Sequence, residues 1–264
     1  MAWARSGDVD LWYERGGEGP PLLYMSGTGG DLRRRPNVFD GPLPERFEVV
    51  AHDHRGQGRS GGPERPYTME DYAEDAVAVL DAVGWPRAHV VGASFGGMVG
   101  QELAIRHPER VDRLVLCCTS SGGAGGASFP LHEVEGLPDD ERLRMMLGVG
   151  DTRLGRAWQE AHPEETARLV ELAGARGRYN PRQLDARRRH DTWDRLDRIA
   201  APTLVAAGRY DGIAPVANAE ALAGRIPGAR LRVFEGGHLF LMEDPAALPA
   251  ITEFLLGSPA DPPS

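Results

Sequence analysis

The segment Val90–Gly97 restricts the fold of this chain more than any other part of the sequence. An apolar strand pattern runs there into Gly-x-Ser-x-Gly, with Ser94 at its centre, and then into a helix expected to begin near Met98. A serine on such a turn has a strained backbone, and Gly92 and Gly96 remove side chains that would clash where the chain doubles back. Because the turn exposes the hydroxyl above the end of a strand, the pattern predicts a nucleophilic serine carried by a sheet.

Seven short apolar runs predict strands, and helical patterns separate them. Strands that alternate with helices form a mostly parallel sheet with helices on both faces, so we expect a doubly wound α/β fold. One helix is expected to begin after Thr68, which forms a capping-box pattern with Asp71, and to end at Gly84. The expected strands are Val9–Glu14, Leu22–Met25, Glu48–Ala51, His89–Val91, Leu114–Cys118, Thr203–Ala207 and Leu231–Phe234.

The stretch 122–194 interrupts this alternation, because it has helical patterns but no strand pattern. Open α/β sheets bind ligands at the carboxyl ends of their strands, and we expect this stretch to form a helical cap, or lid, over that edge. Its first residues, Gly122–Gly126, are interpreted either as a hinge or as a flexible loop. Asn180 followed by Pro181 is typical of a helix start. The other helical patterns lie around Leu143–Leu147, Ala157–Trp158 and Leu169–Leu172.

A chain of 264 residues fits one α/β core with an insertion. We expect the core in two parts, 1–121 and 195–257, with the cap at 122–194 between them and a disordered tail over 258–264. The first ten residues lack the apolar segment of a signal peptide, and no apolar run is long enough to cross a membrane. These features favour a cytoplasmic protein that does not insert into membranes.

All 30 basic residues are arginines. Without lysine, the chain cannot use a P-loop lysine or form a Schiff base with pyridoxal phosphate. The net charge of −9 opposes attraction to nucleic acid and to anionic membranes, so neither is expected as a partner. The adjacent Cys117 and Cys118 lie in an apolar run, where their side chains point to opposite faces, so we expect two buried reduced thiols.

A nucleophilic serine needs a base, and the base needs a carboxylate that orients it. In proteins with this kind of turn, the order along the chain is serine, then acid, then histidine. Asp211 follows the expected strand Thr203–Ala207, and His238 follows Leu231–Phe234, so both side chains come where strands end. We therefore predict Ser94 as the nucleophile, His238 as the base and Asp211 as the orienting acid.

Two main-chain N–H groups are expected to stabilise the oxyanion that this chemistry forms. The residue after the serine, Phe95, should supply the first N–H. The second is expected from Ser26–Gly30, a glycine-rich loop after the strand Leu22–Met25, with Thr28 as the first choice and Gly27 as the alternative. An ordinary glycine turn is the other interpretation of this loop.

The serine turn, the segment Asp53–Ser60, the Asp211 turn and the Gly-Gly-His sequence ending at His238 together resemble the α/β-hydrolase fold superfamily. The similarity spans residues 9 to 256 and is greatest to small cap-bearing members such as 3-oxoadipate enol-lactonase, aclacinomycin methylesterase and cofactor-free haloperoxidases. The resemblance implies an α/β-hydrolase fold in which the turn Asp53–Ser60 is mainly structural. One departure is that the oxyanion loop begins Ser26-Gly27 where the family usually has His-Gly.

These features predict a serine hydrolase that cleaves a small carboxylic ester, lactone or thioester through an acyl-enzyme, with no cofactor and no metal. The alternatives are C–C bond hydrolysis, perhydrolysis or cyclisation by the same residues, and a ligand-binding protein without turnover. The expected partner is a small-molecule substrate. Arginine runs at 33–35 and 187–189 favour an anionic one, because guanidinium groups suit carboxylates, but such runs are also typical of solvated faces.

Overall fold

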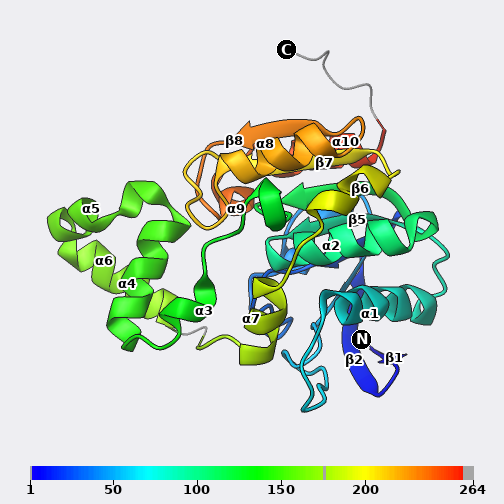
Figure 1. The fold of residues 1–264 in the computed structure, drawn as a ribbon, viewed down its shortest axis with the longest axis horizontal. Helices are drawn as coiled ribbons and strands as arrows, with labels where there is room; N and C mark the ends of the chain where they lie inside the picture. The colour runs from blue at the N-terminus through cyan, green and yellow to red at the C-terminus, as the bar shows by residue number, and fades with distance from the viewer. Residues whose placement is uncertain (1, 175–176, 258–264) are drawn as a thin grey trace.

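Eight strands form one sheet in the computed structural model, which describes residues 2–174 and 177–257. They are β1 (Ala2–Ser6), β2 (Val9–Gly16), β3 (Pro21–Met25), β4 (Glu48–His52), β5 (Ala88–Ala93), β6 (Val111–Cys117), β7 (Thr203–Gly208) and β8 (Arg230–Phe234). The order across the sheet is β1-β2-β4-β3-β5-β6-β7-β8 (Figure 1). The pairs β1–β2 and β2–β4 are antiparallel and all other neighbours are parallel, which confirms the predicted fold class.

The α-helices are α1 (Met69–Ala82), α2 (Phe95–Arg106), α3 (Leu131–Val134), α4 (Asp139–Gly150), α5 (Arg156–Ala161), α6 (Pro163–Gly174), α7 (Pro181–Arg188), α8 (Val216–Arg225), α9 (Phe240–Glu243) and α10 (Ala247–Leu255). Short 3-10 helices occur at Val38–Asp40, Leu43–Glu45, Pro108–Arg110, Gly123–Gly125, Thr152–Leu154 and Trp193–Arg198. None of the helices in the described residues is long and apolar enough to span a lipid bilayer.

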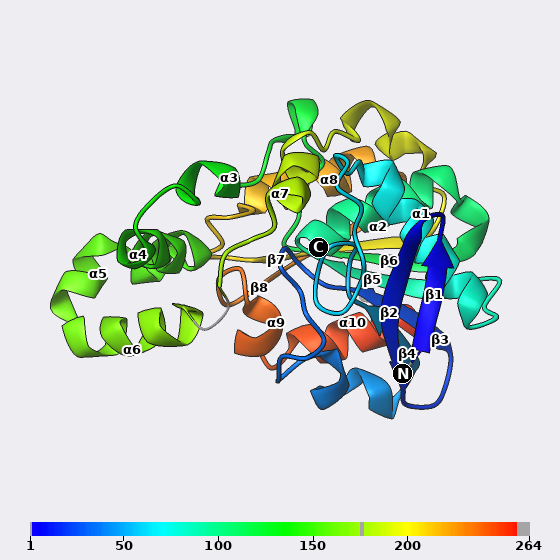
Figure 2. The ribbon, with the colours of Figure 1, turned by 90° about the horizontal axis from the view of Figure 1, so that it is seen from below.

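Helices cover both faces of the sheet, as Figures 1 and 2 show. α1, α2 and α8 pack on one face, whereas α9 and α10 pack on the other. Successive residues of a strand point to opposite faces, so the apolar runs of the parallel strands supply both cores. In β3, for example, Leu23 belongs to the first core and Leu22 to the second, and in β5 the same holds for Val90 and Val91.

The seven strands expected from the sequence are present as β2 to β8, with ends that differ by three residues at most. The sequence pattern does not predict β1, because Ala-Trp-Ala-Arg-Ser contains no run of branched apolar residues. This edge strand pairs with β2, and Trp3 lies opposite Trp12 with the indole rings edge to face and 5.0 Å between ring centroids. A cross-strand aromatic pair of this kind stabilises a strand that local propensity does not specify.

Two helix starts test the sequence analysis in different ways. Thr68 caps α1 as predicted: its side chain accepts from the N–H of Asp71, and the Asp71 carboxylate accepts from the N–H of Thr68. In contrast, α2 begins at Phe95 and not near Met98, because the helix starts directly at the serine turn.

The stretch 122–194 contains α3 to α7 and no strand among its described residues. Figures 1 and 2 both place α4, α5 and α6 beyond one end of the sheet, with α3 and α7 closer to the strands. The side chain of Asn180 caps α7, as the sequence predicts. The two ends of this stretch meet, since the N–H of Thr192 donates to the carbonyl of Ser121 at 2.8 Å and Gly122 packs against the carbonyl of His190. The tail expected over 258–264 lies outside the described residues.

Three histidines are buried, and burial disfavours their charged form. His52, the last residue of β4, and His54 lie edge to face with 5.0 Å between ring centroids, and His190 follows α7. Burial is the main cause that lowers the pKa of His54 to about 4 and that of His190 to about 3, and it lowers the pKa of His52 as well. Because histidine in an unfolded chain titrates near pH 6.5, the folded protein binds fewer protons below this pH than the unfolded chain does.

We expect the free energy of unfolding to fall as the pH drops from about 6.5 toward 4, since only the unfolded chain protonates these histidines in that window. Each histidine contributes at most about 1.4 kcal/mol per pH unit, the limit for a difference of one bound proton. Urea unfolding midpoints at pH 7 and pH 4.5 measure the loss. His52→Leu removes one of the three groups and should lose less stability over the same interval; an equal loss in both proteins would contradict this account.

The turn between β5 and α2 packs main chain directly against main chain. A Cβ atom at Gly92 would lie 2.3 Å from the carbonyl oxygen of Gly96, and a Cβ atom at Gly96 would lie 2.1 Å from the carbonyl oxygen of Met25, the last residue of β3. Side-chain atoms cannot occupy such positions, so both glycines are required for close approach of the backbone and not only for its flexibility.

Gly96→Ala is therefore expected to force α2 away from β3 and to lower the free energy of unfolding by more than about 3 kcal/mol. Gly224→Ala is the matched control, because Gly224 lies in α8 and an added Cβ meets nothing within 4 Å. Alanine should raise helix stability there by up to about 1 kcal/mol. Thermal unfolding of the two variants distinguishes them, and a wild-type melting temperature for Gly96→Ala would refute the packing argument.

Candidate active site

Ser94 lies between the end of β5 and the first residue of α2. Its backbone angles are φ 54° and ψ −113°, a conformation that residues other than glycine rarely adopt. The backbone at Ser94 is therefore strained, as the sequence predicts. The neighbouring strand β6 and the loop after it hold this strained position. The Ser94 N–H donates to the carbonyl of Cys117 at 2.8 Å, and the Thr119 hydroxyl donates to the carbonyl of Ser94 at 2.8 Å.

The structure brings the three predicted residues together at the carboxyl ends of β5, β7 and β8. His238 Nε2 lies 3.0 Å from Ser94 Oγ, and His238 Nδ1 lies 2.8 Å from Asp211 Oδ2. The other carboxylate oxygen of Asp211 accepts from the N–H groups of Ile213 and Ala214, at 2.7 and 2.9 Å. With Nδ1–H donating to Asp211, a neutral His238 leaves Nε2 free to accept the serine proton.

The loops that carry the acid and the histidine are also bonded to the end of α4. The N–H of His238 donates to the carbonyl of Gly150 at 2.7 Å, and the N–H of Gly212 donates to the carbonyl of Val149 at 2.9 Å. Just beyond α4, the N–H of Thr152 donates to the carbonyl of Tyr210 at 2.9 Å. These contacts could not be predicted from the sequence, because main-chain acceptors about sixty to ninety residues away leave no residue-type signal.

The first predicted oxyanion donor is the N–H of Phe95. Phe95 opens α2, so its N–H is one of those that have no acceptor within the helix. Its buried ring packs edge to face against Tyr72 and His54, with centroid distances of 4.8 and 5.4 Å. These contacts hold the turn between β5 and α2 in place. The N–H group is therefore available beside Ser94 on a rigid support.

The second predicted donor lies in the loop Ser26–Gly30. Gly27 is in close contact with Ser94, because a Cβ atom there would lie 3.4 Å from Ser94 Cβ. The N–H of Gly29 donates to Gln183 Oε1 at 2.9 Å, and that of Gly30 donates to the carbonyl of Gly27 at 3.1 Å. These bonds occupy the N–H groups of Gly29 and Gly30, and those of Thr28 and Gly27, the pair named from the sequence, stay as candidates.

This loop is supported by a histidine that the sequence analysis did not single out. His54 Nε2 lies 3.0 Å from the carbonyl oxygen of Ser26, and burial keeps the ring neutral by lowering its pKa to about 4. The adjacent Asp53 accepts from the N–H of Leu32 at 2.7 Å and from that of Arg59 at 2.9 Å. The segment that follows β4 thus supports the loop Ser26–Gly30 through the carbonyl of Ser26.

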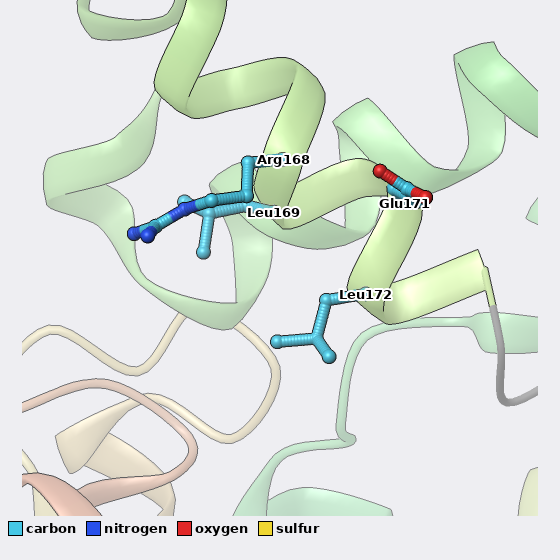
Figure 3. Close-up of a pocket in the computed structure, with 4 residues that line it drawn as sticks. All are labelled: Arg168, Leu169, Glu171 and Leu172. Carbon is cyan, nitrogen blue, oxygen red and sulfur yellow. The ribbon is translucent and has the colours of Figure 1, made fainter.

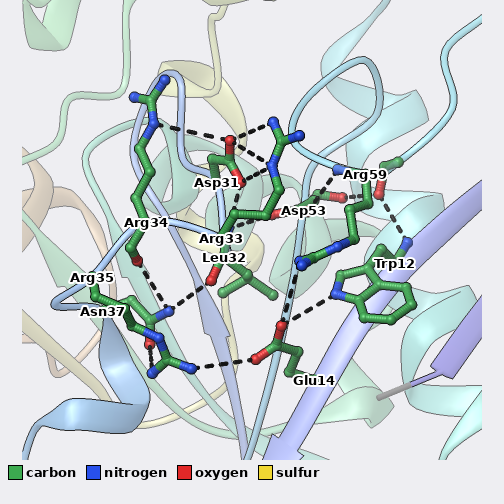
Figure 4. Close-up of polar contacts among 11 residues, drawn as sticks. Trp12, Glu14, Asp31, Leu32, Arg33, Arg34, Arg35, Asn37, Asp53 and Arg59 are labelled. Carbon is green, nitrogen blue, oxygen red and sulfur yellow. Dashed lines mark hydrogen bonds and ion pairs between the residues drawn. The ribbon is translucent and has the colours of Figure 1, made fainter. Parts of the chain in front are cut away.

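The arginine run at 33–35 lies at the surface and is paired with carboxylates, as Figure 4 shows. Arg33 binds Asp31 with both edge nitrogens, at 2.7 to 3.1 Å. Arg35 contacts Asp40 at 3.0 Å and Glu14 at 3.8 Å. These side chains are about half exposed, which fits the solvated-face interpretation of this run.

The second arginine run divides into two environments. Arg188 and Arg189 are exposed and both pair with Asp185 on the same helix. Arg187 is buried, with 5% of the residue exposed, and its Nη1 donates to the carbonyl of Phe129 at 2.8 Å. Only position, and not residue type, distinguishes Arg187 from its neighbours.

Outside this site, the insertion carries two open hollows. One, of about 590 Å³, lies against α6 and is lined by Arg168, Leu169, Glu171 and Leu172 (Figure 3). The other, of about 600 Å³, lies on the outer side of α7 and includes Tyr179 and Arg188. Neither includes a predicted site residue. Within residues 2–174 and 177–257, no three His, Cys, Asp or Glu side chains are grouped so that they could hold a metal ion.

Known proteins share the fold of this chain. A family model described as alpha/beta hydrolase fold matches residues 20–245. A protein of Azorhizobium caulinodans, named as a candidate carbamate hydrolase, RutD, is 34% identical over 273 aligned positions that cover 97% of each chain. The 3-oxoadipate enol-lactonase 2 of Acinetobacter baylyi is 28% identical over 91% of this chain and 90% of its own.

Among solved structures, Est816, described as an enzyme that degrades N-acyl homoserine lactone, is 30% identical with a TM-score of 0.74. The match covers 98% of this chain and 100% of that one. Similarity therefore extends over the core and the insertion together. The chain belongs to the alpha/beta hydrolase fold family and is a hydrolytic enzyme.

Proposed function

We propose that Ser94, His238 and Asp211 form a catalytic triad that hydrolyses a carboxylic ester, lactone or thioester of a small substrate. The observation that carries the proposal is the hydrogen-bonded series from Ser94 Oγ through the imidazole to Asp211, with distances of 3.0 and 2.8 Å. Two of the similar proteins are named for lactones, which are cyclic esters, and this supports the choice of bond.

In the first half of the reaction, Ser94 Oγ attacks the carbonyl carbon while His238 Nε2 takes the hydroxyl proton. Asp211 stabilises the imidazolium and holds its orientation. The N–H of Phe95 and that of Thr28 or Gly27 bind the oxyanion of the tetrahedral intermediate. When the intermediate collapses, the bond to the alcohol or thiol breaks and the leaving group receives the proton from His238, so that an acyl-serine remains.

In the second half, water attacks the acyl-serine and gives its proton to His238. A second tetrahedral intermediate forms, with the same two N–H groups on its oxyanion. Its collapse breaks the bond to Ser94 Oγ, which takes the proton back from the imidazole. The carboxylic acid product leaves and the serine is regenerated.

We infer that residues 122–194 act as the cap of this site. Support comes from contacts at two places: α4 is bonded to the loops of His238 and Asp211, and Gln183 on α7 accepts from the N–H of Gly29 in the oxyanion loop. Asn180 adds a bond from its side-chain amide to the carbonyl of Gly56 at 2.9 Å. A helical layer attached on both sides of the nucleophile is suited to shape the acyl pocket.

A carbamate is the second candidate substrate, because the relative with 34% identity is named for that activity. The same attack, proton transfer and oxyanion contacts would serve a carbamate carbonyl. Purified protein assayed on a matched series of an ester, a lactone, a thioester and a carbamate separates these bonds by kcat/KM.

Ser94→Ala and His238→Ala are each expected to lower ester hydrolysis by about 10⁴–10⁶-fold, and the double variant should lose little more, because triad members act as a unit. A fluorophosphonate should label the wild-type protein at Ser94, as located by mass spectrometry, and should not label Ser94→Ala. Ester turnover by Ser94→Ala above about a tenth of the wild-type rate would rule out the assignment.

Asp211→Asn should lower kcat by about 10³–10⁴-fold with little change in melting temperature, because an amide of the same shape holds the imidazole in the wrong tautomer. Asp112→Asn is the control, since Asp112 pairs with Arg87 at the surface. Its activity should match the wild type. Near-normal activity of Asp211→Asn would show that another residue orients His238.

A further inference from the structure

Arg187 lies on the face of α7 that meets the oxyanion loop. Gln183, one helical turn earlier, is fully buried, and its Oε1 accepts from the N–H of Gly29 at 2.9 Å and from Gln57 Nε2 at 3.0 Å. Residues four apart in a helix share a face, so Arg187 extends from the same side as Gln183. Its guanidinium therefore lies on the side of α7 turned toward the core, opposite the exposed Arg188 and Arg189.

A second set of hydrogen bonds ties Arg187 to the loop of the acid. Its Nη1 donates to the carbonyl of Phe129 at 2.8 Å, and the N–H of Phe129 donates to the carbonyl of Ile213 at 2.7 Å. The N–H of Ile213 in turn donates to Asp211 Oδ1 at 2.7 Å. Arg187 is thus connected to the Asp211 loop through Phe129, whereas Gln183 on the same face of α7 is bonded to the oxyanion loop.

The remaining nitrogen atoms of Arg187 are buried without a partner. In the described part of the chain, Nε and Nη2 make no hydrogen bond and no carboxylate pairs with the guanidinium. Burial lowers the pKa of Arg187 to about 10, so the group still carries its charge at neutral pH. An unpaired buried charge is costly to folding, and a ligand that supplies the missing partner would account for it.

Two other unpartnered polar atoms lie at the same junction. Thr28 Oγ1 in the oxyanion loop and Gln183 Nε2 on α7 are buried and make no hydrogen bond within residues 2–174 and 177–257. Three side chains of α7 and of the loop beside Ser94 thus carry buried polar atoms without a partner, and this points to a polar group on the ligand rather than to an isolated packing defect.

We propose that Arg187 is a specificity-determining residue that binds a free carboxylate of the substrate through Nε and Nη2. The inference rests on the proposed hydrolysis at Ser94 and names its substrate class: acyl compounds with a second, ionised carboxyl group, such as monoesters of short dicarboxylic acids. The leaving group then departs from one end of the acyl chain while Arg187 holds the other.

The geometry of the free edge selects a carboxylate. Nε–H and Nη2–H lie along the same edge of the planar guanidinium group and donate in parallel directions. This spacing matches the two oxygens of a carboxylate. This chain uses the same pair of atoms at another buried arginine: Arg55 Nε and Nη2 each donate to one oxygen of Asp75 at 2.7 Å. At Arg187 the equivalent of Asp75 is missing, and a substrate carboxylate fits that place.

The test compares two esters of equal length, mono-(4-nitrophenyl) glutarate and 4-nitrophenyl pentanoate. Arg187→Gln should lower kcat/KM for the glutarate ester by about 10- to 100-fold, mainly by raising KM, and leave the pentanoate ester within about threefold. Arg187→Lys keeps the charge but not the paired donors, so it should restore part of the loss. Arg189→Gln, two residues away and exposed, is the control and should change neither ester.

The outcomes separate this inference from the proposed function. Equal changes for both esters, or none, would overturn the role of Arg187 and leave that of Ser94 intact. If the wild type cleaves neither ester, hydrolysis fails, and calorimetric titration with glutarate then decides: binding to the wild type that Arg187→Gln loses supports the carboxylate site, whereas equal or absent binding overturns it. Should Arg187→Gln fail to fold, Arg187→Met replaces it, since it keeps the apolar stem.

Discussion

Contact between the main chains of α2 and β3 sets the geometry on which the rest of the site depends. Because Gly96 has no side chain, the start of α2 reaches the carbonyl of Met25, and the loop that follows Met25 therefore begins directly beside the nucleophile. The same approach places Gly27 against Ser94, next to Phe95 as the first residue of α2. The proposed nucleophile and oxyanion donors thus share one rigid origin, which the loops of Asp211 and His238 reach from β7 and β8.

Features that depend on neighbours in the chain could be predicted from the sequence. A few consecutive residues specify each of three such features: the strained turn at Ser94, the capping box at Thr68, and the polar turns after β7 and β8. Their partners in space follow from the rule that parallel strands end at the same edge of a sheet. Strand β1 could not be predicted from the sequence, because its stability comes from pairing with Trp12 on another strand and not from its own composition.

Features that depend on distant partners could not be predicted. His54 contacts the carbonyl of Ser26 at the start of the loop Ser26–Gly30, yet it comes from a segment nearly thirty residues further on. The six arginines of the two runs are alike as residues, and the fold alone decides that five are exposed and Arg187 is buried. Helix phase and the carboxylates nearby determine the difference, and neither can be read from a run of identical letters.

The bonds from Val149 and Gly150 to the loops of Asp211 and His238 have a mechanical consequence. Rotation of α4 as a rigid body would pull on the imidazole, because the carbonyl of Gly150 holds the N–H of His238 itself. The end of α4 is therefore the part of the insertion that has to stay in place when the other helices move. A movement of the insertion that admits a ligand without shifting His238 has to occur on the opposite side, where α7 meets the oxyanion loop. Ligand access and the alignment of His238 thus depend on different ends of the same helical layer.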